Sequence, residues 1–389
     1  MHVGFSLLTL FPGRVGGSES NVRGLLGQFA DGNGPERVTV LANRHVMAAY
    51  GPYARGPVSL HEVHSYRPGD GNLTRLLAMT AAGLLPRIAA RDVPRDLDVL
   101  HHPVTVPVPQ LVDVPSVTTL LDLQHHELPE SFPPAERLFR RWAYDGAGRR
   151  ADLVVTISEH ARAQIAAMEG IGPDRVESVP LGVDTGRFNQ SPTEGDRALA
   201  ARLPARFVVY PANLWPHKNH ARLVEALAHV PDRDLHLVLS GQTYGRLDAL
   251  LGHARRAGVA DRITHAGYLQ PEEMPALLRT ARALVFPSLF EGFGLPPLEA
   301  MACGCPVACS STGSLPEVVD EAGLLFDPRA PGEIAGTIDS VTSDDAVRAR
   351  LIASGLERAR HFTWAAAARR HVALYRRAAA MRREPRSPR

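Results

Sequence analysis

Cysteine is scarce in this sequence: there are only three, at Cys303, Cys305 and Cys309. Three thiols so close together raise the question of a metal site, but Pro306 and apolar residues separate them and no fourth ligand with a familiar spacing lies nearby. We therefore interpret them as small buried side chains of a protein in a reducing compartment.

Long hydrophobic runs are also missing. The most apolar stretch, Leu76 to Leu85, is ten residues long and is soon followed by Pro86 and Arg87, whereas a membrane-spanning helix needs about 20 apolar residues. The apolar segment His2 to Leu10 has neither a basic leader nor a small-residue cleavage site, so we interpret it as a first strand and not as a signal peptide. We expect a cytoplasmic protein, at most peripheral at the inner membrane face.

A strong excess of charge of one sign is absent as well. The chain has 43 Lys and Arg residues against 41 Asp and Glu residues, which gives no reason to expect nucleic acid as a partner. The segment Arg376 to Arg389 holds six arginines and one glutamate. We interpret it as a solvated terminus, with contact to anionic lipid as the alternative.

What the 389 residues do contain is a regular alternation of short apolar strands and longer helical patterns. Strands of unbroken apolar residues are typical of parallel sheets with helices on both faces. The length suits two domains, and the pattern breaks near Asp184 to Arg197. We therefore predict an α/β protein with two Rossmann-like, doubly wound parallel-sheet domains, residues 1–186 and 187–362. The strands are expected at 3–8, 38–41, 99–101, 117–121, 153–157, 207–210, 235–239, 284–286, 307–309 and 324–326, with a weaker one near Ile263.

Ligands of parallel sheets bind beyond the carboxyl ends of the strands, so the loops that follow the predicted strands are the first places to search. The first such loop carries Gly13, Gly16 and Gly17 and ends at Ser18, a candidate helix N-cap. These glycines would let the backbone approach a phosphate or an acceptor, but they also suit an ordinary turn. The loop lacks the full G-x-G-x-x-G pattern, which argues against a dehydrogenase.

A second loop, residues 211–219, contains Lys218, the only lysine of a chain with 42 arginines. Placed before a helix that Asn219 could cap, a compact ammonium would meet a diphosphate as a point charge. The alternative is a solvated lysine used by chance. We favour the diphosphate interpretation.

A third loop, after the strand at 284–286, presents two carboxylates. Glu291 lies beside Gly292 and Gly294, which free the backbone, and Glu299 falls in the early turns of the following helix. A glutamate near a helix N-terminus can simply compensate the helix dipole. Carboxylates are also good acceptors for sugar and ribose hydroxyls, and we favour that role for the pair.

The stretch from Glu291 to Glu299, with two glutamates separated by seven residues, resembles the signature of retaining GT-B glycosyltransferases of family 4. Further motifs similar to those of the family follow in order along nearly the whole chain, at Gly16-Gly17, 179–184, 211–219, 303–307 and 313–317. The resemblance implies a GT-B fold, two such domains facing across a cleft, with the acceptor on the first and the nucleotide sugar on the second. It also implies a last helix at about 363–380 that returns to the first domain, followed by a basic tail at 381–389.

The resemblance implies roles for single residues. Glu291 and the amides beside it would hold the transferred sugar, Glu299 the ribose, and Lys218 with the Gly16-Gly17 backbone the diphosphate. Where many relatives carry an arginine, this chain has Asn213, whose amide can bind a phosphate but cannot neutralise it, so Arg222 is an alternative source of charge. The expected donor-binding residues are Gly16, Gly17, Asn213, Lys218, Gly241, Gly292, Phe293, Gly294, Leu295 and Glu299.

For catalysis, the resemblance implies retention at the anomeric carbon, with the leaving diphosphate taking the proton of the acceptor and no protein nucleophile. The expected catalytic residues are Glu291, His102 and Asp122. The other histidines near the same strand ends, His101, His125 and His126, are further candidates, and ordinary hydrogen bonding in a loop is the alternative for each of them.

No metal and no cofactor is expected. Asp-x-Asp occurs twice, at Asp96 to Asp98 and at Asp232 to Asp234, but each copy precedes a strand and so lies at the wrong end of its sheet. A divalent cation is therefore not assigned to either.

The expected activity is transfer of a hexosyl, and by loose resemblance a mannosyl, unit in polysaccharide or glycoconjugate biosynthesis. The donor would be a GDP- or UDP-hexose, with GDP-mannose slightly favoured. The acceptor, whether a glycan, a lipid-linked sugar or a small molecule, is not specified by the sequence. Two alternatives stay open: an NDP-sugar epimerase or other GT-B enzyme with the same diphosphate site, and a catalytically silent GT-B partner subunit.

Overall fold

The computed structural model describes residues 1–13, 17–66, 74, 78–79 and 90–381. The chain divides into two compact units, which are described separately below. The first comprises Met1–His125, Phe132–Gly182 and Trp364–Arg389, and the second comprises His126–Ser131 and Val183–Thr363. Apart from the short segment His126–Ser131, the chain passes to the second unit at Gly182–Val183 and returns at Thr363–Trp364, where the sequence predicted boundaries after residues 186 and 362.

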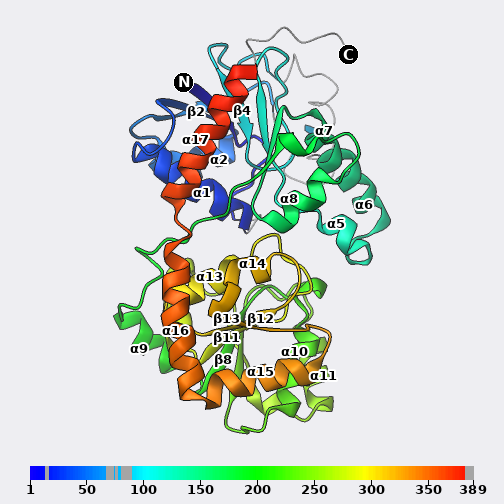
Figure 1. Cartoon of the computed structure of the whole chain (residues 1–389), viewed down its shortest axis with the longest axis vertical. Helices are drawn as coiled ribbons and strands as arrows, with labels where there is room; N and C mark the ends of the chain where they lie inside the picture. The colour runs from blue at the N-terminus through cyan, green and yellow to red at the C-terminus, as the bar shows by residue number, and fades with distance from the viewer. Residues whose placement is uncertain (14–16, 67–73, 75–77, 80–89, 382–389) are drawn as a thin grey trace. The chain divides into compact units, whose positions relative to one another are not determined.

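Seven parallel strands form the sheet of the first unit, in the order β3-β2-β1-β4-β5-β6-β7. Two of them, β2 and β4, are labelled in Figure 1. Every residue of the central strand β1 is buried, as expected for a strand with helices on both faces of its sheet. The strands are β1 His2–Ser6, β2 Arg37–Ala42, β3 Val58–Glu62, β4 Val99–His102, β5 Ser116–Thr119, β6 Leu153–Thr156 and β7 Val176–Ser178. The α-helices up to residue 182 are α1 Gly17–Ala30, α2 Arg44–Tyr50, α5 Gln124–Glu127, α6 Pro134–Arg140, α7 Gly146–Arg150 and α8 Glu159–Ala166.

The last helix, α17 (Trp364–Met381), belongs to the first unit and packs against α1, β4 and β5. Its Trp364 ring takes the space beside Gly24 of α1, where a Cβ atom would lie 2.3 Å from the indole. A buried hydrogen bond of 2.7 Å joins the Tyr375 hydroxyl to Nδ1 of His101, whose Nε2 lies 2.9 Å from the Thr119 hydroxyl. Close packing and these two hydrogen bonds together fix the helix on the sheet.

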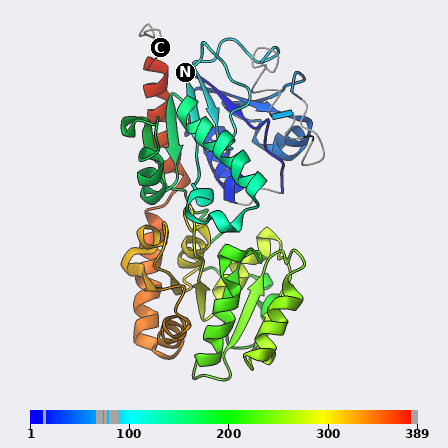
Figure 2. The same ribbon diagram turned by 90° about the vertical axis from the view of Figure 1, so that its right-hand side faces the viewer.

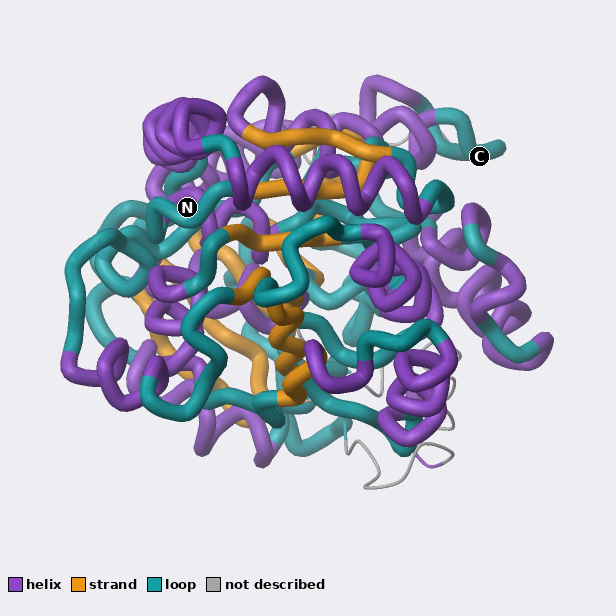
Figure 3. Tube along the Cα trace, turned by 90° about the horizontal axis from the view of Figure 1, so that it is seen from below, coloured by secondary structure: helices purple, strands orange, loops and turns teal. Residues whose placement is uncertain are grey.

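Six parallel strands form the sheet of the second unit, in the order β10-β9-β8-β11-β12-β13. Helices flank both faces of this sheet (Figures 2 and 3): α10 packs against α11 and α15, and α13 against α12, α14 and α16. The strands are β8 Phe207–Pro211, β9 His236–Ser240, β10 Ile263–His265, β11 Ala283–Phe286, β12 Val307–Ser310 and β13 Gly323–Phe326. The helices are α9 Glu194–Ala200, α10 His220–His229, α11 Leu247–Arg256, α12 Met274–Thr280, α13 Leu295–Ala302, α14 Leu315–Val319, α15 Pro331–Ser343 and α16 Asp345–Arg360.

The predicted architecture of two doubly wound parallel sheets is confirmed, but two strands of the first unit were missed. Both β3 and β7 lie at an edge of the sheet. In β3 only Val58 is fully buried, and β7 is three residues long. Neither therefore shows the unbroken apolar run by which a central strand is recognised.

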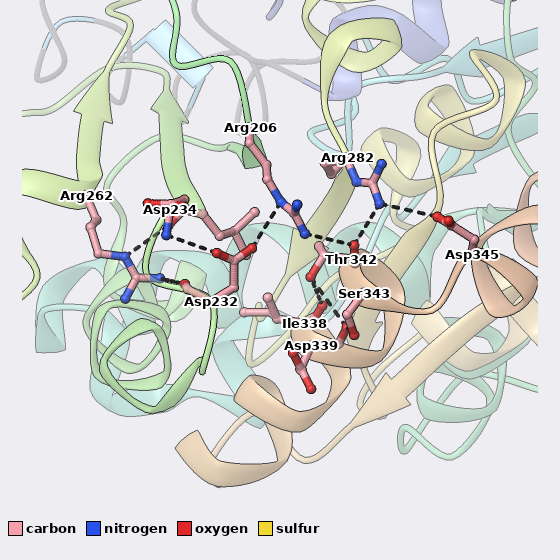
Figure 4. Close-up of polar contacts among 11 residues, drawn as sticks. Arg206, Asp232, Asp234, Arg262, Arg282, Ile338, Asp339, Thr342, Ser343 and Asp345 are labelled. Carbon is pink, nitrogen blue, oxygen red and sulfur yellow. Dashed lines mark hydrogen bonds and ion pairs between the residues drawn. The ribbon is translucent and has the colours of Figure 1, made fainter.

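Charged residues tie together the end of the second sheet at which its strands begin (Figure 4). Arg206 pairs with Asp232 at 3.0 Å, and the Asp232 carboxylate also accepts the Asp234 amide at 3.0 Å. Arg282 donates to the Thr342 carbonyl at 2.7 Å, near the C-terminus of α15, where a cation is favoured by the helix dipole. The second Asp-x-Asp copy is thus part of the scaffold at this end of the sheet.

The first Asp-x-Asp copy has a similar place in the first unit. Asp96 pairs with Arg37 at 2.7 Å, and the Asp98 carboxylate accepts the His2 amide at 2.8 Å. Both carboxylates hold the chain before a strand.

The structure also describes the few cysteines and the lack of long hydrophobic runs. The three cysteines are free and buried, and burial raises the pKa of both Cys303 and Cys305 to about 12. Among the residues that the structure describes, no helix combines the length and the apolar character needed to cross a bilayer.

Candidate functional site

The loops at the carboxyl edge of the second sheet hold one another in place. At Gly313, with φ +63°, a Cβ atom would lie 3.1 Å from the Glu291 carbonyl oxygen, so the approach of these two loops favours glycine. The Ser314 hydroxyl lies 2.9 Å from the Glu291 carbonyl and 2.8 Å from the Phe293 carbonyl, both of which accept from it. The loop after β12 therefore fixes the backbone around Glu291.

The side chain of Glu291 meets the only lysine of the chain. Lys218 Nζ lies 2.5 Å from Glu291 Oε1, and the two side chains are 18% and 13% exposed. The ammonium also lies 5.6 Å from the centre of the Phe286 ring, within the range of a cation–π contact. One compact ion pair thus joins two of the predicted ligand-binding residues, which are 73 residues apart in the sequence.

Buried polar groups position the backbone of Lys218. The Tyr210 hydroxyl at the end of β8 donates to the Lys218 carbonyl at 2.7 Å and lies 3.0 Å from the Ser288 hydroxyl. Burial, reinforced by the charge of Glu291, raises the pKa of Tyr210 well above its ordinary value, so the phenol keeps its proton. Neither Tyr210 nor Ser288 was predicted from the sequence. A buried tyrosine at a strand end needs a hydrogen-bond partner. This requirement could have indicated from the sequence that Tyr210 has a structural role at the site.

Asn219 precedes α10 as predicted but does not cap it. Its backbone is left-handed, with φ 61°, and its side chain makes no capping hydrogen bond. The amide instead donates to the carbonyls of Pro287 and Pro328, at 3.0 and 2.7 Å. The predicted helix cap is wrong because the Asn219 side chain binds these two carbonyls instead. The two hydrogen bonds connect the loop at residues 211–219 to its neighbours.

Gly241 is required where the loops after β8 and β9 touch. At φ +138° a Cβ atom there would lie 2.7 Å from the Ala212 carbonyl oxygen and 2.9 Å from the Asn213 amide nitrogen. The Asn213 side-chain oxygen accepts the Gln242 amide at 2.8 Å and links the same loops. Asn213 therefore has a structural hydrogen bond in addition to the phosphate contact expected of it.

A pocket of about 250 Å³ opens at these loops. Three of the predicted donor-binding residues, Asn213, Lys218 and Gly241, lie on its wall. Its other lining residues are Pro211, Ala212, Trp215, Ser240, Tyr268, Leu269, Met274, Phe286 and Pro296. The pocket has one cation and mostly apolar walls, a composition suited to a small ligand with an anionic group.

The other predicted residues of this unit lie on the loop after β11 and on α13. Gly294 has a left-handed backbone, φ 108°, at the start of α13, and Leu295 is the first residue of that helix. The Phe293 ring is buried against Phe362, with the ring centres 5.8 Å apart, so only the backbone of Phe293 can serve a ligand. Neither Gly292 nor Leu295 lines the pocket described above.

Glu299 lies in α13 and is partly exposed. Burial raises the pKa of its carboxyl to about 8, and the positive charge of Arg187 opposes the shift. A carboxyl in this state is largely protonated at neutral pH and can both donate and accept hydrogen bonds. Such a group suits a pair of neighbouring hydroxyls.

We expect this carboxyl to make stability depend on pH. Because its pKa is higher in the folded chain than the ordinary 4.5, folding becomes less favourable as pH rises from about 5 to about 8. Across this window the free energy of unfolding of Glu299→Gln should rise relative to that of wild type by up to about 1.4 kcal/mol per pH unit. The rise is smaller in practice because the residue keeps some exposure. Urea unfolding at several pH values measures the difference, and parallel profiles for the two proteins would contradict the assignment.

In the first unit, the predicted residue His102 keeps one ring nitrogen without a hydrogen bond to the described residues. It ends β4, is 2% exposed, and its Nε2 lies 2.8 Å from the Pro109 carbonyl. A carbonyl only accepts, so Nε2 carries the proton, and among the described residues Nδ1 has no hydrogen-bond partner. Burial lowers the pKa of His102 to about 4, which leaves a neutral imidazole with one lone pair to accept a hydrogen bond.

The remaining candidates of the first unit are used within the fold. Asp122 accepts the Gln124 amide at 3.1 Å at the start of α5. His101 is buried between Tyr375 and Thr119, and His125 lies 3.1 Å from Asp145.

Two further candidates lie at the glycine loop. Gly17 is the first residue of α1, and Gly16 falls outside the described residues. Glu19, which was not predicted, accepts the Gly13 amide at 2.6 Å and binds Arg23. It thereby holds the described start of this loop.

Comparison with family models finds two matches. "Glycosyltransferase Family 4" matches residues 15–187, and "Glycosyl transferases group 1" matches residues 193–358. The two matches follow one another along the chain and together take in both units.

Curated relatives agree with these matches. The chain is 33% identical over 254 residues to O-antigen chain mannosyltransferase B of Escherichia coli, covering 64% of this chain and 67% of that protein. It is 31% identical over 255 residues to the MMP alpha-(1->4)-mannosyltransferase of Mycolicibacterium hassiacum, covering 62% and 59%. The chain thus matches between somewhat over half and two thirds of the length of these relatives.

Solved structures are similar over almost the whole chain. Sucrose-phosphate synthase of Thermosynechococcus elongatus has a TM-score of 0.76 at 22% identity, covering 98% of this chain and all of that one. Anabaena HepE in complex with UDP and glucose has a TM-score of 0.72 at 19% identity, covering 97% and 100%. At such identities the likeness supports the GT-B fold.

Proposed function

Because this chain belongs to the group 1, family 4 glycosyltransferases, we propose that it transfers a hexosyl unit from a nucleotide-diphosphate sugar to an acceptor hydroxyl with retention of configuration. The observation that carries the proposal is the 2.5 Å contact between Lys218 and Glu291 beside a small-molecule pocket. This contact places a cation that can bind the diphosphate next to a carboxylate that can bind sugar hydroxyls.

The residues of the second unit divide the donor between them. Lys218 binds the diphosphate and stabilises the negative charge that grows on it as the glycosidic bond breaks. Glu291 and the amides of Gly292, Phe293 and Gly294 hold the sugar, and Glu299 holds the ribose hydroxyls. The enzyme contributes positioning and charge stabilisation, while the leaving diphosphate takes the proton of the acceptor.

The first unit supplies the acceptor side and His102. Its unprotonated Nδ1 accepts a hydrogen bond from a hydroxyl of a substrate sugar and orients it. With a pKa of about 4, His102 stays neutral at physiological pH and works as a hydrogen-bond acceptor, whereas a proton donor would need a higher pKa.

The transferred sugar is mannose and the donor GDP-mannose. This finer assignment is supported by the two relatives named above as mannosyltransferases, and the complexes of HepE with UDP make a UDP-hexose the alternative.

A screen of nucleotide sugars by thermal shift tests the proposal. We expect GDP-mannose to raise the unfolding midpoint of the full chain, since a ligand that binds only the folded state stabilises it by mass action. Donors that bind are then incubated with the enzyme, and free nucleoside diphosphate is measured. An epimerase would return an altered nucleotide sugar without releasing the diphosphate. If no GDP or UDP sugar binds, the proposal is overturned and a silent subunit remains.

A further inference from the structure

The outer face of α6 and of the π-helical turn that follows it exposes large apolar side chains in the first unit. Leu138 is 72% exposed and Trp142 is 47% exposed. They are four residues apart on one helical path, since α6 Pro134–Arg140 continues into a π-helix at Arg141–Asp145. We call the surface formed by Arg137, Leu138, Arg141 and Trp142 the α6 surface.

The helical path is anchored to the unit by its opposite side. Ala143 and Ala147 are buried, and Ala147 packs in a core cluster with Leu120 and Leu123. Phe139 lies beside Trp142, with ring centres 6.2 Å apart, and supports the exposed indole. The apolar side chains of the α6 surface are thus held outward by a fixed helix, and the core does not use them.

Cations accompany the apolar side chains. Arg137 and Arg141, also four residues apart, neighbour Leu138 and Trp142 in the sequence. The ion pairs of this stretch among the described residues are Arg140–Glu136 and His125–Asp145, and they involve neither arginine. Of the two acidic residues of this stretch, Glu136 is already paired with Arg140 at 3.0 Å, and Asp145 is buried beside His125 at 3.1 Å. The α6 surface therefore combines apolar groups with positive charge that is not neutralised locally.

We propose that the α6 surface docks on the surface of an anionic lipid bilayer. Tryptophan and leucine on one side of a helix, bordered by arginine, form the pattern that sits at the boundary of headgroups and acyl chains. The arginines add attraction to anionic headgroups, and their long apolar stems can lie along the same boundary. The proposal does not depend on the transfer reaction, so it stands or fails separately from it.

A second copy of this chain fits the same surface poorly. The area that two apolar side chains, Leu138 and Trp142, can bury falls well short of the roughly 800 Å² that each partner buries in a stable interface. In a two-fold dimer the same patch meets itself, so Arg137 and Arg141 would face their own copies and repel them. Docking on a bilayer does not require a minimum interface area of this kind, and anionic headgroups carry the charge opposite to that of the two arginines.

Sedimentation with vesicles tests the proposal on the full chain. We expect wild type to bind vesicles of phosphatidylcholine with phosphatidylglycerol more tightly than vesicles of phosphatidylcholine alone. Leu138→Ser/Trp142→Ser should weaken binding at least about tenfold on anionic vesicles. Arg137→Gln/Arg141→Gln should weaken it about tenfold and reduce its dependence on salt. Leu325→Ser, at a residue of the second unit that is 42% exposed, is the matched control and should bind as wild type does.

A second readout covers the case in which the serine variant fails to fold. Brominated lipid should quench tryptophan fluorescence in wild type and less in Trp142→Phe, which keeps an apolar ring. The proposal is overturned if wild type shows no preference for anionic vesicles, or if the variants bind as tightly as the control. It is also overturned if light scattering shows a wild-type dimer that Leu138→Ser/Trp142→Ser dissociates, because the occupant is then a second copy.

Discussion

Replacing Lys218 by methionine should lower the rate of donor consumption about a hundredfold, the usual cost of removing one preorganised group that stabilises a developing negative charge. Methionine keeps an unbranched apolar stem above the Phe286 ring and removes only the ammonium. Because Asn213 cannot supply a positive charge, no neighbour in the same pocket compensates. The release of nucleoside diphosphate, measured over a range of donor concentrations, gives both kcat and KM.

Two further variants make the result specific to Lys218. Lys218→Arg keeps the charge in a bulkier form and should lose less activity than Lys218→Met. Arg222, the alternative source of charge, is about half exposed and paired with Glu225 at 2.8 Å, so Arg222→Met should behave as wild type. An equal loss in Arg222→Met, or none in Lys218→Met, would contradict the assignment of the diphosphate to Lys218.

The central strands of both sheets could be predicted from the sequence because each is a short apolar run buried on both faces. Every residue of β1, β11 and β12 is buried, as are the first four residues of β8. Edge strands such as β3 are covered less completely and keep polar residues, so the same criterion misses them.

The residue types of the candidate site were visible in the sequence, but their contacts were not. A lone lysine and two glutamates beside glycines are local features, and they indicated a ligand with phosphate and hydroxyl groups. The ion pair between Lys218 and Glu291 joins loops after two different strands and exists only once the sheet has formed. The same holds for the hydrogen bonds of Tyr210 and Ser314, which position those loops.

His102 illustrates a different limit. Its position at the end of a predicted strand made it a candidate, but the same argument applied to the adjacent His101. Alternation along β4 sends the two rings to opposite faces of the sheet, one to the Tyr375 hydroxyl and the other to the Pro109 carbonyl. Only the packing of α17 on one face decides which histidine is used by the core.

Glu291→Gln should have opposite effects on two measurements. The carboxylate of Glu291 pairs with Lys218 at 2.5 Å, so a nucleoside diphosphate has to compete with it for the ammonium. Glutamine removes this competing charge, and we expect GDP or UDP alone to bind several-fold more tightly, as for an exchange worth about 1 kcal/mol. Turnover of the complete donor should nevertheless fall about a hundredfold, since the sugar hydroxyls lose a charged acceptor.

The two effects can be separated with a double-mutant cycle. If Lys218 and Glu291 act through their mutual contact, the gain in nucleotide affinity caused by Glu291→Gln should vanish in a Lys218→Met background. Calorimetric titration with the nucleotide measures all four proteins. A gain that persists without the lysine would mean that Glu291 repels the diphosphate directly, and weaker nucleotide binding in Glu291→Gln would show that the ion pair helps to build the pocket and does not compete with the ligand.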